Sequence, residues 1–344
     1  MEQKMTNKYK FSRRDFFKLA GLVFAGLTLS ACGVKETESP IKLPVNHPFD
    51  YYGWFYVLYG ERDNDLAEIA EYMNTAFATS PEQVKLLKAH KFEHIIFVFN
   101  ESAILEGLWK NEGRNAPDPA PAGVLFYDNE VPNFRKKFFV AYQQYMEQLK
   151  DSLIAAGVYD QIDVYYIADE PALHRNVYRD QDFLDQYVDE FHNVFQGKKS
   201  AITFAENKDP ENLYPGTGPH YNPPEHLDLV AVDPYFIDPK TGAVDLPCER
   251  TAIRDWLYKD NSFSNINWAK QFKKPIIVIG DAQLKADQPP KDCYVLETYS
   301  ILKEDPAVVG LVWFIYDKEY EEGDYLRGAA NNPSLVELIE TLGR

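Results

Sequence analysis

This sequence has far fewer basic than acidic residues. Its 344 residues contain 36 Lys and Arg against 53 Asp and Glu, which gives a formal net charge of −17. A surface of this charge repels nucleic acid and anionic lipid headgroups, so we exclude nucleic acid as a partner. Neutral or cationic substrates suit such a surface better than strongly anionic polymers do.

Metal-binding side chains are also few. There are three Cys and seven His, and none of them forms a zinc pattern. His220 and His226 lie among prolines, and the i,i+4 pair Glu170 and His174 lacks a third ligand. The sequence therefore predicts no metal site and no cofactor. Cys248 and Cys293 either form a disulfide or are ordinary small residues, and their spacing leaves both open.

The apolar run from Leu19 to Ala31 is too short to span a bilayer as a helix. It follows Ser12-Arg13-Arg14-Asp15-Phe16-Phe17-Lys18, and the two together resemble a twin-arginine export signal. Leu29-Ser30-Ala31-Cys32 resembles a lipobox, which implies cleavage before Cys32 and a lipid on that cysteine. A chance arginine pair before a core helix is the alternative.

These resemblances imply an export route and a cellular location for the protein. The signal peptide is expected over residues 1–31 and a proline-rich tether over 32–49. The twin-arginine export machinery and the membrane, reached through the lipid on Cys32, become expected partners. Gly33 after the lipidated cysteine favours the outer membrane, with the protein facing the periplasm. Twin-arginine substrates fold before export. A cofactor or metal enzyme therefore remains one interpretation of this sequence, although the sequence contains no ligand motif for it.

The rest of the chain, residues 50–344, predicts one α/β domain. Apolar strand-like runs alternate with amphipathic helical patterns, which favours a (β/α)8 TIM barrel over a doubly wound sheet. The eight predicted strands are Trp54 to Tyr59, Tyr72 to Ala78, His94 to Phe99, Val164 to Ala168, Ala201 to Ala205, Leu229 to Val232, Ile276 to Ile279 and Val309 to Ile315. The predicted helices are Asp65 to Ala70, Pro81 to His90, Pro132 to Ala156, Asp182 to Phe195, Ala252 to Phe272, Cys293 to Lys303 and Ser334 to Leu342.

Two long connections follow predicted strands, Asn100 to Val131 and Glu206 to Asp228. In a parallel barrel both overhang the carboxyl ends of the strands, where they can wall a groove that suits a polymer. Polar and aromatic residues at the same ends provide candidate substrate contacts, because carboxylates recur and aromatic rings stack on sugars. They are Asn100, Asp169, Glu206, Asp233, Tyr235, Gln283, Trp313 and Tyr316, beside Glu170 and Asp281.

The most informative segment is Val164-Tyr165-Tyr166-Ile167-Ala168-Asp169-Glu170-Pro171. An apolar strand runs into two adjacent carboxylates and is stopped by proline, which cannot extend a sheet ladder. Strand ends of this kind deliver side chains to ligands. The alternative is that Asp169 and Glu170 only cap the next helix.

These motifs resemble the superfamily of (β/α)8 glycoside hydrolases that carry catalytic carboxylates on strands four and seven. Ala168-Asp169-Glu170-Pro171 matches the acid/base segment, Lys274 to Ile279 looks like the seventh strand, and Gly310-Leu311-Val312-Trp313-Phe314 is similar to the eighth. The resemblance implies that Glu170 is the acid/base and that Trp313 lies beneath the sugar. One carboxyl would protonate the leaving oxygen while the other attacks the sugar or activates water.

The sequence departs from that pattern on the seventh strand. Gly280 falls where the family's nucleophilic Glu is expected, and Asp281 comes one residue later, on the opposite face unless a bulge intervenes. Asp281 is the expected nucleophile or base, with Glu206 and Asp233 as alternatives. The leading interpretation is a lipid-anchored periplasmic glycoside hydrolase acting on a polysaccharide. The second is a glycan-binding lipoprotein of the same fold that has lost one carboxylate.

Overall fold

A computed structural model describes twelve segments of the chain. They are residues 48–55, 63–111, 113, 133–171, 180–204, 221–234, 246–260, 265–282, 284–285, 290–316, 321–322 and 326–344. The predicted signal peptide, Cys32 and most of the predicted tether lie outside these residues.

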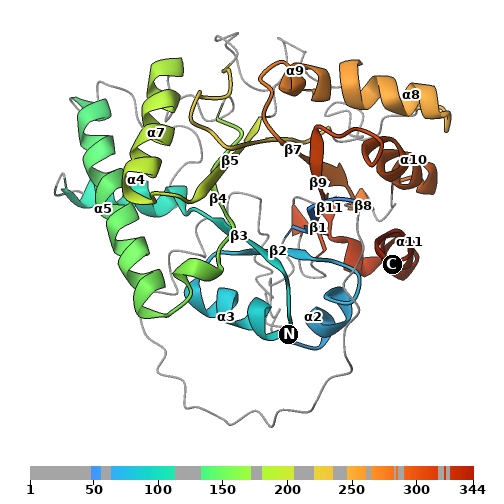
Figure 1. Cartoon of the computed structure of the whole chain (residues 1–344), viewed down its shortest axis with the longest axis horizontal. Helices are drawn as coiled ribbons and strands as arrows, with labels where there is room; N and C mark the ends of the chain where they lie inside the picture. Colours follow the sequence, from blue (N-terminus) through green and yellow to red (C-terminus); the bar gives the residue numbers. More distant parts are fainter. Residues whose placement is uncertain are drawn as a thin grey trace, which may run out of the picture.

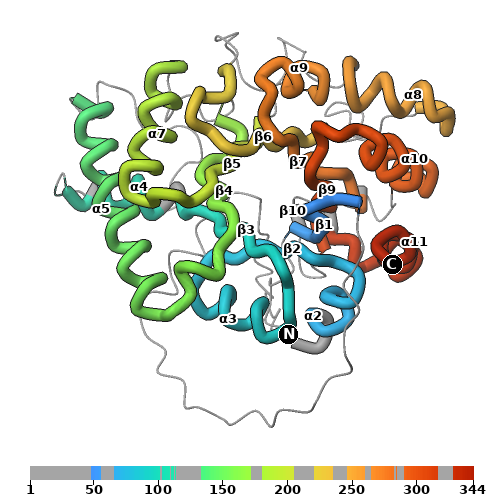
Figure 2. The backbone as a smooth tube through the Cα atoms, in the orientation of Figure 1, coloured from blue at the N-terminus to red at the C-terminus, as the bar shows by residue number. Residues whose placement is uncertain are grey.

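Eight parallel strands close into a barrel in the order β1-β2-β3-β4-β5-β6-β7-β9, which confirms the predicted fold class. The first and last strands pair in register from Tyr51 opposite Gly310 to Trp54 opposite Trp313, and Figure 2 shows them side by side. The barrel strands are β1 (Tyr51–Trp54), β2 (Thr75–Ala78), β3 (His94–Val98), β4 (Val164–Asp169), β5 (Lys199–Phe204), β6 (Leu229–Val232), β7 (Ile276–Asp281) and β9 (Val308–Phe314).

Helices surround the strands as an outer ring (Figure 1). They are α2 (Asp63–Ile69), α3 (Pro81–Ala89), α4 (Glu101–Asn111), α5 (Phe134–Ala155), α7 (Gln181–Val194), α8 (Arg250–Asp255), α9 (Ile266–Lys270), α10 (Asp292–Leu302) and α11 (Pro333–Gly343). Short helical turns lie at η1 (Tyr159–Gln161) and η3 (Ala329–Asn331), and η2 (Trp256–Asp260) is a π-helical turn.

Several predicted elements differ in their bounds, and the second strand begins at Thr75 instead of Tyr72. Strand β1 begins at Tyr51, so the predicted first strand overlaps it only at Trp54. Helix α4 occupies the first part of the connection after β3, where Ile104 and Leu108 bury one face against the core. The predicted helix from residue 252 to 272 is divided, because the Asn265 side chain accepts the Trp268 N–H at 3.1 Å and starts α9 anew.

The side chains of the strands separate into two buried layers. Alternate residues, including Tyr51, Ile96, Val164, Ile277 and Val312, fill the barrel interior. The residues between them pack outward against the helices in a second, larger cluster. This alternation tells which strand residues face the interior of the barrel and which face the helix layer.

Two smaller features accompany the barrel. A three-stranded antiparallel sheet joins β8 (Leu284–Lys285), β10 (Glu321–Glu322) and β11 (Leu326–Arg327). A disulfide joins Cys248 to Cys293, which resolves the alternative that the sequence left open. None of the helices in the described part of the chain has the length and apolarity needed to cross a membrane.

At the amino end of the barrel, Asp163 links β3 to β4. Its Oδ1 lies 3.3 Å from His94 Nδ1, and its Oδ2 accepts the Ile95 N–H at 3.0 Å. Burial opposes ionisation of this carboxyl, but the contacts with His94 and the Ile95 N–H outweigh it and lower the pKa of Asp163.

We therefore expect Asp163 to contribute stability above its unfolded pKa of about 4 and to lose it as pH falls through the lower folded pKa. Urea unfolding from pH 7 down to pH 2 measures this, and Asp163→Asn should flatten the acid side of the stability curve. Asp160→Asn is the control, since the Asp160 side chain is 97% exposed. Parallel curves for wild type and Asp163→Asn would contradict the assignment.

Candidate active site

Seven of the predicted site residues fall within the described segments, at or beyond strand ends. They are Asn100, Asp169, Glu170, Asp233, Asp281, Trp313 and Tyr316. Glu206, Tyr235 and Gln283 lie outside the described residues. The carboxyl ends of β3, β4, β6 and β7 share one edge of the barrel because its strands are parallel.

The end of β4 brings the acidic pair to this edge. A register irregularity between Tyr166 and Ala168 shifts the alternation, so that Tyr166 and Asp169 lie on the same inner side of the barrel. Glu170 follows with φ of 47°, in the left-handed region that residues with a Cβ rarely adopt. Its N–H donates to the Thr203 carbonyl at 2.9 Å, which helps to hold this conformation. Strained backbone of this kind is common at functional sites.

Asp169 belongs to a buried hydrogen-bonded group. The Tyr166 hydroxyl lies 2.5 Å from Asp169 Oδ1 and 2.6 Å from Thr203 Oγ1. Asp169 is 6% exposed and Glu170 8%, so both carboxyls are removed from bulk water. The sequence prediction omitted Tyr166 and Thr203, for which the only signal was a hydroxyl group within an otherwise apolar strand.

Asp281 faces the barrel interior. Ile277 and Ile279 fill the interior from β7, and Asp281 continues their alternation. Gly280 faces the helix layer instead, because a Cβ built on it would meet Trp313 Cε3 at 2.8 Å. Asp281 therefore occupies the inward position at the end of β7, whereas Gly280 faces away from the barrel interior.

Trp313 does not lie in the site that the resemblance implied. It packs in the outer cluster, is 1% exposed, and donates its Nε1–H to the Tyr52 hydroxyl at 3.1 Å. The physical reason is strand alternation, which turns Val312 and Phe314 inward and Trp313 outward. β9 contains one extra residue, Val309, relative to its partner strand β7. This bulge determines which of the following β9 residues face inward.

Phe314 provides the inward aromatic ring of β9. It pairs in register with Asp281, so the two side chains are neighbours on the inner face. Its ring centroid lies 5.7 Å from that of Phe55, which in turn lies 4.2 Å from Phe77 and 5.8 Å from Tyr166. Four aromatic rings thus pack across the interior of the barrel near the carboxylates. The sequence prediction missed Phe314 because it assigned this role to Trp313.

The remaining predicted residues have mixed placements. Asn100 accepts the Ala103 N–H on its Oδ1 at 3.1 Å, which makes it the N-cap of α4. Asp233 is partly buried and continues the inward alternation of β6. The Tyr316 ring lies against Trp54 of the outer cluster, with 5.4 Å between centroids. The structure therefore groups Asp169, Asp233 and Asp281 on the inward alternation and leaves Trp313 and Tyr316 on the outer layer.

Close packing between Gly280 and Trp313 can be tested directly. We expect Gly280→Ala to lower the free energy of unfolding by about 1–3 kcal/mol, because the new methyl group overlaps a buried ring that is also tied to Tyr52. Gly107→Ala in α4 is the control, since its Cβ would meet nothing closer than 4.0 Å, and alanine favours helix. Urea denaturation measures both, and a wild-type midpoint for Gly280→Ala would contradict the packing.

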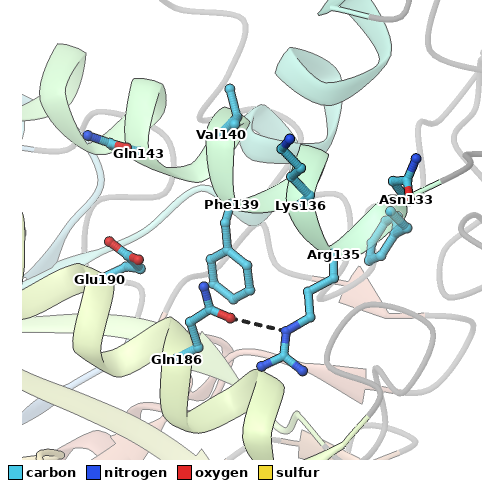
Figure 3. A pocket seen from close by; sticks show the side chains of 9 residues that line it. Asn133, Arg135, Lys136, Phe139, Val140, Gln143, Gln186 and Glu190 are labelled. Atoms are coloured by element: carbon cyan, nitrogen blue, oxygen red, sulfur yellow. Dashed lines mark hydrogen bonds between the residues drawn. The ribbon is translucent and has the colours of Figure 1, made fainter.

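A separate pocket lies between α5 and α7 (Figure 3). Arg135 crosses it to donate to Gln186 Oε1 at 3.0 Å, and Phe139, Lys136 and Glu190 lie around it. None of the predicted site residues lines this pocket. Within the described residues, no group of three or more His, Cys, Asp or Glu is placed to hold a metal ion.

Comparison with known proteins supports the fold. No protein-family model and no curated protein matches this sequence. Among solved structures, a β-D-glucuronidase of Dictyoglomus thermophilum matches with a TM-score of 0.53 at 14% identity, covering 86% of this chain and 50% of its own. A β-galactosidase of Marinomonas ef1 matches with a TM-score of 0.52 at 8% identity, covering 85% of this chain and 59% of its own.

The chain thus spans about half to six-tenths of the length of these two enzymes. Both are glycoside hydrolases, and this chain has the barrel fold of such enzymes. At this level of identity the likeness shows the fold alone.

Proposed function

We propose that this protein is a glycoside hydrolase that cleaves a polysaccharide with Glu170 as the general acid and Asp281 as the nucleophile or base. The observation that carries the proposal is the inward position of Asp281 at the end of β7, on the same barrel edge as Glu170 after β4. Glycoside hydrolysis needs two carboxyl groups, one to protonate the leaving oxygen and one to act on the sugar or on water.

The alternative is a glycan-binding protein of the same fold. The burial of Asp281, which is 2% exposed, favours it, because a nucleophile must reach the sugar. Incubating the purified protein with a panel of neutral and amino-sugar polysaccharides and measuring new reducing ends separates the two. Released reducing ends support the hydrolase, whereas calorimetric binding without release supports the binder.

The location is part of the same proposal. We place the protein in the periplasm, anchored to the outer membrane through the lipid on Cys32, after export by the twin-arginine machinery. The Cys248–Cys293 disulfide supports an oxidising compartment. Labelling cells with a radioactive fatty acid tests the anchor, since Cys32→Ser should abolish the label, and a labelled Cys32→Ser protein would reject it.

A further inference from the structure

Inside the barrel, Asp169 of the acidic pair forms a hydrogen-bonded row with the hydroxyl groups of Tyr166 and Thr203. Tyr166 and Thr203 come from neighbouring strands and are 3% and 0% exposed. The Tyr166 hydroxyl stands between Asp169 Oδ1 at 2.5 Å and Thr203 Oγ1 at 2.6 Å. These hydrogen bonds take no part in the proton transfers of the proposed function.

Counting the protons shows which of these groups donates to which. A phenol has one proton, so Tyr166 donates to one neighbour and accepts from the other. Within the described residues, Tyr166 is the single hydrogen-bond partner of Thr203 Oγ1. If Tyr166 donated to Thr203, the buried Thr203 proton would lack an acceptor, which is unfavourable. Thr203 therefore donates to Tyr166, and Tyr166 donates to the carboxylate of Asp169.

Thr203 also acts through its backbone. Its carbonyl accepts the Glu170 N–H at 2.9 Å, and its Cα pairs in register with Asp169. One residue of β5 thus supports both members of the acidic pair, through its side chain for Asp169 and through its main chain for Glu170.

We infer that Tyr166 and Thr203 are positioning residues that hold Asp169 as a fixed anion beside Glu170. The inference rests on the proposed function, because the use of such an anion lies in the reaction. Glycoside cleavage passes through an oxocarbenium-like transition state, whose positive charge a fixed carboxylate stabilises. Asp169 accepts the hydrogen bond and so leaves proton donation to Glu170.

Single substitutions separate this role from packing. Tyr166→Phe keeps the ring that packs on Phe55 and Phe77 but removes the donor. We expect kcat to fall roughly tenfold to hundredfold, with KM changed much less, because the lost bond acts on developing charge. Thr203→Val should give a smaller loss, and Thr203→Ser, which keeps the hydroxyl, should restore wild-type kcat.

Tyr165→Phe is the matched control. Tyr165 is the neighbouring residue on β4, it is 0% exposed and faces the helix layer, and its hydroxyl has no hydrogen-bond partner within the described residues. The kcat of Tyr165→Phe should equal that of the wild type. If Tyr166→Phe and Tyr165→Phe have the same kcat on a glycan that the wild type cleaves, the positioning role is overturned while the hydrolase stands.

Crystal structures of the variants provide a readout that does not depend on turnover. In Tyr166→Phe the Asp169 carboxylate should leave the position it has in the wild type, and in Thr203→Ser and Tyr165→Phe it should stay. If the wild type cleaves no glycan, the hydrolase proposal fails, and these structures alone decide the positioning role. An unmoved Asp169 in Tyr166→Phe overturns it, and a displaced one supports it.

Discussion

Turnover of a susceptible glycan is expected to fall by about 10²- to 10⁴-fold when Glu170 is replaced by Gln, because the amide has nearly the same shape but cannot donate an acid proton. Glu170 is 8% exposed and its main chain is tied to Thr203, so an isosteric change should leave the fold intact. Initial rates of reducing-end release measure the effect. Glu147→Gln on the exposed side of α5 is the control and should match the wild type.

The same experiment with Asp281→Asn distinguishes the general acid from the nucleophile or base. A glycoside with a very good leaving group needs little protonation, so Glu170→Gln should recover much of its rate on such a substrate. Asp281→Asn should stay slow on both substrates, because its loss affects attack on the sugar or activation of water. Equal responses of the two variants to the leaving group would reject the division of roles, and wild-type rates for Glu170→Gln would reject the acid.

The order of strands was predictable from the sequence because each barrel strand is buried on both faces. Such strands are continuous apolar runs: the run from Leu229 to Val232 coincides with β6, and the run from Ile276 to Ile279 forms the first four residues of β7. The same property hides the direction of each side chain, because an apolar residue is acceptable on either face. Continuous apolarity thus fixes where a parallel strand lies but not how it is rotated.

Rotation of the strands explains the errors in the predicted site. The extra residue at Val309 turns Trp313 toward Tyr52 and Phe314 toward the interior. The local signal for it is Gly310, since a glycine inside a strand often marks a bulge. Gly280 was expected at the nucleophile position, yet it is the residue that makes room for the Trp313 ring. Asp281 and Phe314 were each one residue from the expected position, and they are paired with one another across β7 and β9.

Loss of the Cys248–Cys293 disulfide is expected to lower the free energy of unfolding by about 4 kcal/mol, the chain-entropy value for a separation of 45 residues. The closed segment contains β7 and Asp281. Cys248 is exposed, so Cys248→Ser removes little packing and reports mainly on the cross-link. Urea denaturation of Cys248→Ser should give this loss. Cys293→Ser and the double variant should lose slightly more, because either single change already breaks the bond and Cys293 also packs against the core.

Reduction of the wild type offers a second test that bears on export. A reductant should lower the urea midpoint of the wild type to about that of Cys248→Ser and leave the double variant unchanged. A twin-arginine substrate folds in the reducing cytoplasm before the disulfide can form. The proposed export route therefore requires the reduced protein to stay folded, with native circular dichroism and a cooperative transition. Unfolding on reduction alone would contradict the proposed route, whereas an unshifted midpoint would show that the cross-link does not stabilise the fold.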